Sequence, residues 1–209
     1  MSDHDSSATL SAYHTRESLL LRLKEGANEE VWQDFYDIYG RLIFGYSLHF
    51  DISYSEAEDI VQEVCIKVFR QIMRFDYSRE RGRFRGWLKT ITHNAVIDYL
   101  RRKQNRSKTS SEYRKWLEQE EEAAEGDDQI WRLEWEKAVF EMALDRVRER
   151  VGEETIRIFL CYVLEARSAA EVADETTLDA NAIYAVKHRV LKFIREEVAI
   201  IMENERGVE

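Results

Sequence analysis

Apolar side chains recur every three or four residues along most of this chain, which is the spacing of one face of an α-helix. No stretch shows the convincing alternation of apolar and polar residues that is typical of a half-buried strand. The 209 residues contain no proline and only eight glycines, so few positions interrupt a helix. We therefore predict an all-α protein.

Four helices are predicted in the first half of the chain. The first begins near Leu19, and the second carries an apolar and aromatic stripe from Val31 to Tyr46. Ser55 and Glu58 have the spacing of a capping box, which predicts that the third helix begins there. The predicted inner face of the third helix consists of Ile60, Val61, Val64, Val68 and Ile72, and the outer face of Asp59, Gln62, Glu63 and Arg70. The fourth helix is predicted from about Phe84 to Arg102.

The helical pattern then fades and resumes. Polar and strongly acidic residues predict a flexible linker, after which helices are predicted over Trp131–Val151 and Glu153–Ala166, followed by two shorter ones. The predicted organisation is a disordered tail at 1–14, a small helical domain at 15–105, an acidic linker at 106–130 and a second helical domain at 131–205.

The last part of the chain has the pattern of a helix-turn-helix. Ser168 and Glu171 form a second capping box, Leu178 closes the turn, and Asp179 can cap the next helix. That helix directs Ile183, Val186, Val190 and Ile194 inward, and it offers Asn181, Tyr184, Lys187, His188, Arg189, Lys192 and Arg195 on its other positions. Polar side chains in such a place reach base edges in the major groove of DNA. A helical hairpin with a solvated outer face would show the same pattern, and these residues alone leave both interpretations open.

The charge of the chain is unevenly distributed. A net charge of -10 argues against a nucleic-acid binder at first sight. Between residues 76 and 108, however, ten Lys and Arg residues face three acidic ones, for a local charge of +7. Between residues 117 and 136, nine acidic residues face one Arg, for a local charge of -8. Opposite blocks of this size predict a polarised molecule, and they raise the hypothesis that the acidic segment folds back on the basic helix.

Two segments have both a functional and a purely structural interpretation. The basic turn at residues 79–87 interleaves arginines with aromatic rings, which suits single-stranded nucleic acid. Phe84 and Trp87 could instead anchor the start of the fourth helix in the core, which Leu88 and Ile91 favour for Trp87, and the arginines and Asn94 are the better candidates for function. The acidic outer face of the third helix could be a protein-binding surface or merely a solvated one.

Other chemistry is not indicated. The five histidines are scattered, Cys65 and Cys161 lie far apart among apolar residues, and no nucleotide-binding or catalytic motif appears. We therefore expect no enzyme activity, no metal and no cofactor. The chain shows no membrane span and no signal peptide, which predicts a cytoplasmic protein.

Three groups of residues, taken in order, resemble bacterial RNA polymerase sigma factors of the extracytoplasmic-function (ECF) group within the sigma-70 family. DIVQEV at 59–64 resembles the helix of region 2.2, and RGRFRGWLKTITHNAVIDYLRR at 81–102 resembles regions 2.3 and 2.4. AEVA at 170–173, NAIY at 181–184 and KHRVL at 187–191 resemble region 4. The match covers about residues 15–105 and 135–200.

The resemblance implies an alternative sigma factor that binds core RNA polymerase, recognises promoter −35 and −10 elements and promotes DNA melting. The residues implied to dock on the clamp helices of the polymerase β′ subunit are Asp59, Gln62 and Glu63. Those implied to contact the −10 element are Arg83, Phe84, Arg85, Gly86, Asn94, Arg101 and Arg102. Those implied to contact the −35 element are Asn181, Tyr184, Ala185, Lys187, His188, Arg189 and Lys192. The resemblance also implies contact of region 4 with the β flap, and ECF sigma factors are often restrained by an anti-sigma factor.

The chain departs from the family pattern in its second half. Thr177 stands where the turn of the helix-turn-helix usually has Gly, and Thr176 where Leu is common. Because a β-branched residue resists a positive φ, the geometry of this turn is left open. The acidic linker is also longer than the family leads us to expect.

Two other functions remain as alternatives. The chain could be a stand-alone helix-turn-helix regulator that dimerises on a palindromic site. It could also be an adaptor that binds polymerase without initiating transcription.

Overall fold

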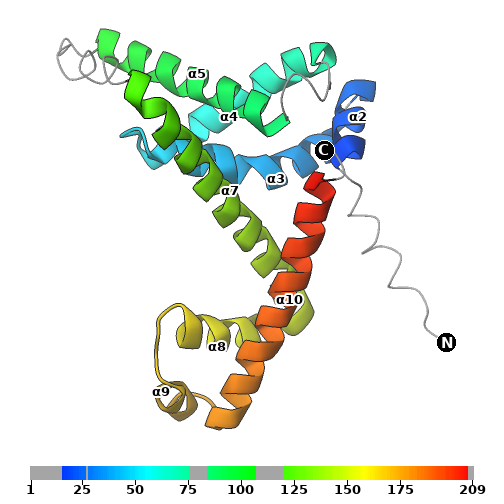
Figure 1. Ribbon diagram of the computed structural model, residues 1–209, viewed down its shortest axis with the longest axis vertical. Coiled ribbons are helices and arrows are strands. Elements are labelled where there is room, and N and C mark those ends of the chain that lie inside the picture. Colours follow the sequence, from blue (N-terminus) through cyan, green and yellow to red (C-terminus); the bar gives the residue numbers. More distant parts are fainter. Residues whose placement is uncertain (1–15, 27, 76–83, 107–119, 207–209) are drawn as a thin grey trace. The chain divides into compact units, whose positions relative to one another are not determined.

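The computed structural model describes residues 16–26, 28–75, 84–106 and 120–206, and all regular elements in these ranges are helices (Figure 1). In chain order they are α2 (Arg16–Gly26), α3 (Glu29–Leu48), α4 (Tyr54–Gln71), η1 (Ile72–Arg74), α5 (Phe84–Arg106), α7 (Glu120–Val151), α8 (Glu153–Val163), α9 (Ala169–Asp174) and α10 (Ala180–Arg206). The prediction of an all-α protein is confirmed. None of the helices in these ranges has the length and apolar character needed to cross a membrane.

The chain divides into two compact units, and the boundary falls inside α7. The first unit comprises residues up to Ala138, and the second runs from Val139 to Arg206. The second half of the predicted flexible linker, residues 120–130, is helical instead. The reason lies in its composition, because Glu and Ala are good helix formers and acidic residues are favourable in the first turns of a helix. The predicted tail at 1–14 and residues 107–119 of the predicted linker lie outside the described ranges.

Helix α4 begins two residues earlier than the sequence pattern predicted. Its N-cap is Ser53, whose backbone N–H donates to the Glu56 carboxylate at 2.7 Å. Both Ser53 and Ser55 are followed three residues later by Glu, so the capping-box spacing could not choose between them. The choice of Ser53 buries Ile52 before the cap and Ala57 inside the first turn, which is the placement of a hydrophobic staple.

The core of the first unit lies between α3, α4 and α5, which pack against one another (Figure 1). The five apolar residues predicted for the inner face of α4 are all buried. An aromatic cluster closes the other side, in which Phe84 at the start of α5 lies 5.3 Å from Tyr39 and 5.7 Å from Phe75 between ring centroids. The first residue of α5 is thereby fixed against α3.

The second unit consists of the end of α7 with α8, α9 and α10. Helix α8 ends at Val163 rather than Ala166, and the last helix is 27 residues long rather than short. It continues because apolar residues recur on its inner face as far as Ile201, which is buried. The predicted capping box at Ser168 and Glu171 is present, and Asp179 Oδ1 accepts the backbone N–H of Ala182 at 2.7 Å. The four residues predicted to face inward from α10 are buried.

Candidate nucleic-acid and protein interfaces

The outer face of α4 presents two of the three predicted docking residues to solvent. Asp59 and Gln62 are exposed. Glu63 is held by ion pairs, with Lys67 at 2.9 Å and with Arg102 of α5 at 2.6 Å. Burial would raise the pKa of Glu63, but hydrogen bonds from Lys67 and Arg102 outweigh it and lower this pKa. Asp59 and Gln62 are therefore ready for a partner, whereas Glu63 already has two.

The basic end of α5 is neutralised along its length by acidic side chains. Besides the Arg102–Glu63 pair, Lys103 lies 2.9 Å from Glu56, and Arg101 lies 3.8 Å from Asp98. The backbone N–H of the N-cap residue of α4, followed by the ammonium of Lys103, lowers the pKa of Glu56 to about 2. The pairs of Arg102 and Lys103 join the predicted DNA-binding helix to the predicted polymerase-binding helix, whereas Arg101 and Asp98 both belong to α5.

The residues predicted to line the −10 site lie in different surroundings. Phe84 is 1% exposed within the aromatic cluster, so in this conformation its ring cannot stack on a base, and its role is to anchor α5. Gly86 and Asn94 are exposed on α5. Arg85 places its guanidinium 4.9 Å from the ring centroid of Trp135 in α7, a cation–π contact. Arg83 lies outside the described ranges.

Helix α7 meets α5 and α3 through a cluster of charged and polar groups. Lys89 Nζ lies 2.6 Å from an Asp127 carboxylate oxygen and 2.5 Å from Asp128, and its side chain is only 17% exposed. The hydroxyl of Tyr46, a buried residue of α3, donates to Asp127. His93 Nδ1 lies 3.0 Å from that hydroxyl and 3.8 Å from Asp127 Oδ1.

The cluster fixes Asp127 in its charged form. Burial would raise its pKa, but hydrogen bonds from His93, Lys89 and Tyr46 outweigh it and lower the pKa of Asp127 to about 2. The pKa of Tyr46 is raised far above its ordinary value, first by burial and then by its bond to Asp127. Asp127 is therefore an anion enclosed by donors.

Aromatic packing continues the contact one turn further along α7. Trp131 meets the ring of Tyr46 edge to face at 5.1 Å, and Trp135 stacks on Tyr39 at 6.2 Å with 23° between the ring planes. Glu134 lies 2.9 Å from His49 Nε2. The residues of this contact were not selected from the sequence as site residues, although the opposite charge blocks predicted attraction between the two segments.

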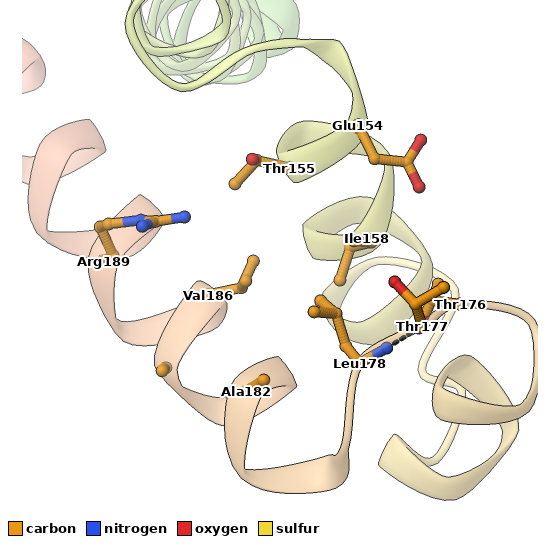
Figure 2. A pocket seen from close by; sticks show the side chains of 10 residues that line it. Glu154, Thr155, Ile158, Thr176, Thr177, Leu178, Ala182, Val186 and Arg189 are labelled. Atoms are coloured by element: carbon orange, nitrogen blue, oxygen red, sulfur yellow. Dashed lines mark hydrogen bonds between the residues drawn. The ribbon is translucent and has the colours of Figure 1, made fainter.

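The helix-turn-helix in the second unit makes its turn without a glycine. Among the described residues, only Asp51 and Ala166 have a positive φ without being glycine, so Thr177 does not need one. The hydroxyl of Thr176 donates to the carbonyl of Val172 at 2.9 Å. It also accepts the backbone N–H of Leu178 at 3.3 Å (Figure 2). This hydroxyl satisfies backbone groups in the turn, which explains how threonine is accommodated where the family has other residues.

The outer positions of α10 are available for contact. Of the residues predicted for the −35 element, those exposed are Asn181, Tyr184, Ala185, His188, Arg189 and Lys192. Lys187 is half-buried, with its ammonium 5.4 Å from the ring centroid of Tyr162. Arg189 lines a pocket of about 510 Å³, where it lies across from Thr155 of α8 (Figure 2).

Comparisons with known proteins match the part of the chain that contains most of α3 and all of α4 and α5. The sequence model of the family described as Sigma-70 region 2 matches residues 35–106. The chain is similar to the ECF RNA polymerase sigma factor SigE of Mycolicibacterium smegmatis, with 42% identity over 48 residues, which are 23% of this chain and 17% of the relative. It is also similar to the ECF RNA polymerase sigma factor SigW of Bacillus subtilis, with 34% identity over 82 residues, which are 39% of this chain and 42% of the relative.

The similarity to these relatives is therefore limited in extent, since the matched segments span less than half of either one. A solved structure of CnrH in complex with the cytosolic domain of CnrY is similar over 89% of this chain and 96% of that one, with 16% identity and a TM-score of 0.34.

Proposed function

We propose that the chain is an alternative sigma factor of the sigma-70 family, on the basis of its match to Sigma-70 region 2 at residues 35–106 and its similarity to two ECF sigma factors. It binds core RNA polymerase, recognises the −35 and −10 elements of a promoter and promotes DNA melting. The observation that supports this best is the α4–α5 hairpin within the matched segment, which presents exposed acidic and polar residues on one helix and a basic end on the other. Acting with RNA polymerase, the protein works in the cytoplasm.

Core polymerase is held by the outer face of α4 in this proposal. Asp59 and Gln62 are exposed and lie on the same face of the helix, where they suit a basic, polar partner surface such as the β′ clamp helices. Glu63 extends that face but is shared with Lys67 and Arg102. Asp59 is therefore the cleaner position at which to test polymerase binding, because replacing Glu63 would also disturb the α4–α5 pairing.

Promoter DNA is contacted by α5 and α10. Exposed Asn94 and the basic residues at the end of α5 face the −10 element, and the exposed outer positions of α10 read the −35 element in the major groove. Unstacking DNA costs about 1.4 kcal/mol per base-pair step. Capturing one base by stacking returns about 1–3 kcal/mol. One captured base offsets only a step or two, so strand opening requires the larger polymerase complex.

The test is run-off transcription from a genomic-fragment library with purified core RNA polymerase, with and without this protein. Discrete new start sites are expected, each preceded by shared −35 and −10 sequences. Asp59→Lys should abolish them and also abolish co-elution with core in gel filtration. Asp37→Lys, an equal charge change at an exposed position of α3, is the matched control and should retain both activities.

Each negative result points to a different alternative. Core binding without new start sites would favour the polymerase-binding adaptor. No core binding, together with a stable dimer on a palindromic site, would replace the sigma factor with a stand-alone regulator. A tight, sequence-specific promoter complex of the isolated chain at physiological salt would also count against the proposal.

A further inference from the structure

The first turns of the described part of α7 cover a face of the first unit that has its own chemical character. Beneath α7 lie the rings of Tyr39 and Tyr46 from α3, and the cations Arg85 and Lys89 from α5. Rings on which bases can stack, flanked by cations that follow a phosphate backbone, are the features with which proteins bind single-stranded nucleic acid. His93 of α5 borders this face, with its Nδ1 3.0 Å from the Tyr46 hydroxyl.

The covering segment of α7 offers the complementary chemistry. Asp127 and Asp128 place carboxylates on the ammonium of Lys89, where a phosphate would otherwise bind. Trp135 stacks on Tyr39 and Trp131 meets Tyr46 edge to face, so indole rings cover both tyrosines where bases would otherwise lie. Anions at one end and aromatic rings along the helix resemble the two recognition features of a short single strand.

We propose that residues 127–135 of α7 act as an internal mimic of single-stranded DNA, which occupies a binding face formed by Tyr39, Tyr46, Arg85 and Lys89. This inference rests on the proposed function, since it names the DNA form that this face takes and the segment that competes with it. DNA and α7 exclude one another on this face. A single strand binds only when the α7 segment has left.

The contact has features of a reversible one. The indole N–H of Trp131 is buried and has no hydrogen-bond partner among the described residues, which weakens the docked state because the N–H loses its water. The side chain of Asp128 is 78% exposed although it contacts Lys89, so its ion pair is screened by water and salt. When α7 leaves, the indole N–H of Trp131 regains water and only a screened ion pair of Asp128 is lost. Both features lower the free-energy cost of replacing α7 with a ligand that pairs with Lys89.

The experiment measures binding of the isolated full chain to a fluorescein-labelled dT12 oligonucleotide by fluorescence anisotropy between 50 and 200 mM salt. Asp127→Asn with Asp128→Asn should raise the affinity at the lowest salt roughly fivefold or more. It should also make the slope of log K against log salt more negative by about 0.7 for each additional phosphate that the protein binds. Adding Lys89→Gln to this pair of changes removes the cation that the phosphate would use, and the affinity should return to that of the unchanged chain.

The matched control separates local competition from net charge. Glu136→Gln with Glu149→Gln removes the same two charges from exposed positions of α7 without touching the cluster. An equal rise in affinity in this control, no rise in the Asp variant, or a rise that survives Lys89→Gln would each overturn the inference. Should the double Asp variant fail to fold by circular dichroism, Asp128→Asn alone, at its exposed position, must show a smaller rise of the same kind, and its absence would overturn the inference equally.

Failure here is distinguishable from failure of the proposed function. The dT12 assay contains no polymerase, whereas the transcription assay uses the unchanged chain with core. If new start sites appear and dT12 binding is unaltered in the Asp variant, only the inference that α7 competes with DNA is rejected. Tighter dT12 binding without polymerase activity would keep the covered nucleic-acid site and remove the sigma factor.

Discussion

The two helices assigned to DNA, α5 in the first unit and α10 in the second, differ in what their cations touch. On α5, Lys89 and Arg102 each lie within 2.6 Å of a carboxylate oxygen. On α10, Arg189 is exposed and forms no ion pair within the part of the chain that the structure describes, and Lys192 pairs only with Glu196 of the same helix, at 3.8 Å. The cations of the first helix must exchange protein partners for phosphates, whereas Arg189 of the second can bind without exchange.

This difference predicts an order of events. An exposed ion pair contributes about 0–1 kcal/mol, so exchange at Arg102 costs little. Lys89 is more enclosed and has two carboxylates, so its release costs more. Contact of α10 with duplex DNA should therefore precede contact of α5 with an opened strand. Opening of the DNA should depend on a partner that breaks the ion pairs of Lys89 and Arg102 in the first unit.

The largest expected effect comes from breaking the aromatic contact that holds α7 on the first unit. Trp135 is 2% exposed, and truncation of a buried Trp to Ala typically costs about 3–5 kcal/mol. Trp135→Ala should lower the unfolding temperature of the first unit, measured by calorimetry, and leave the transition of the second unit in place. Leu133→Ala, at a 52% exposed position two residues away, is the control and should change stability by less than about 0.5 kcal/mol. An equal loss in both transitions would show that the two units do not unfold separately.

The second-largest expected effect concerns Arg189, an exposed cation of α10. Arg189→Ala should weaken binding of the polymerase complex to a −35 duplex by about 1–3 kcal/mol, because a base or phosphate contact is lost without any internal pair being broken. The unfolding temperature should stay unchanged, in contrast to substitutions on α5. Arg195→Ala, exposed on another side of the same helix, is the matched control for charge. Equal losses in the two variants would mean that α10 contributes only its general positive field.

A third, smaller effect depends on pH. The pKa of Asp127 is about 2 in the folded chain against an ordinary value of 3.8, so the folded state favours the charged carboxylate. The stabilisation is complete above about pH 4 and is lost as the pH falls through 4 toward 2, and its upper limit is about 2 kcal/mol. Urea unfolding of the first unit should lose stability in this window, and Asp127→Asn should remove that part of the loss. An identical pH profile in the variant would mean that Asp127 contributes nothing to the docking of α7.

The sequence predicted the elements better than it predicted their partners. The inner face of α4, the inward residues of α10 and the cap at Ser168 follow from local spacing, and the structure confirms each of them. The start of α4 was misplaced because two Ser-x-x-Glu spacings overlap, and only the burial of Ile52 distinguishes them. Local patterns predict helix periodicity and capping. They do not predict the tertiary contact that decides between two equally spaced caps, here Ser53 and Ser55.

The candidate site shows the same limit. Exposure of Asp59 agrees with its predicted position on the outer face of α4, and Asn94, predicted as a −10 contact, is exposed on α5. The burial of Phe84 and the pairing of Glu63 with Arg102 depend on which helices meet, which no spacing along one helix reveals. The helical start of α7 was hidden in the sequence by its many charges, since these residues suit both a solvated linker and the beginning of a helix.

The smallest expected effect concerns the Glu63–Arg102 ion pair between α4 and α5. It tests whether this pair contributes to the free energy of unfolding of the first unit. Glu63→Gln and Arg102→Gln should each lower the stability of the first unit by about 1 kcal/mol or less, since both side chains are partly exposed. In a double-mutant cycle measured by urea unfolding, the coupling should be about 0.5 kcal/mol and should shrink in high salt. Lys67 shares Glu63, so Lys67→Gln must be included to separate the two pairs. A coupling of zero would mean that Arg102 is as free for DNA as Arg189, and the ordering of α10 before α5 would then rest on Lys89 alone.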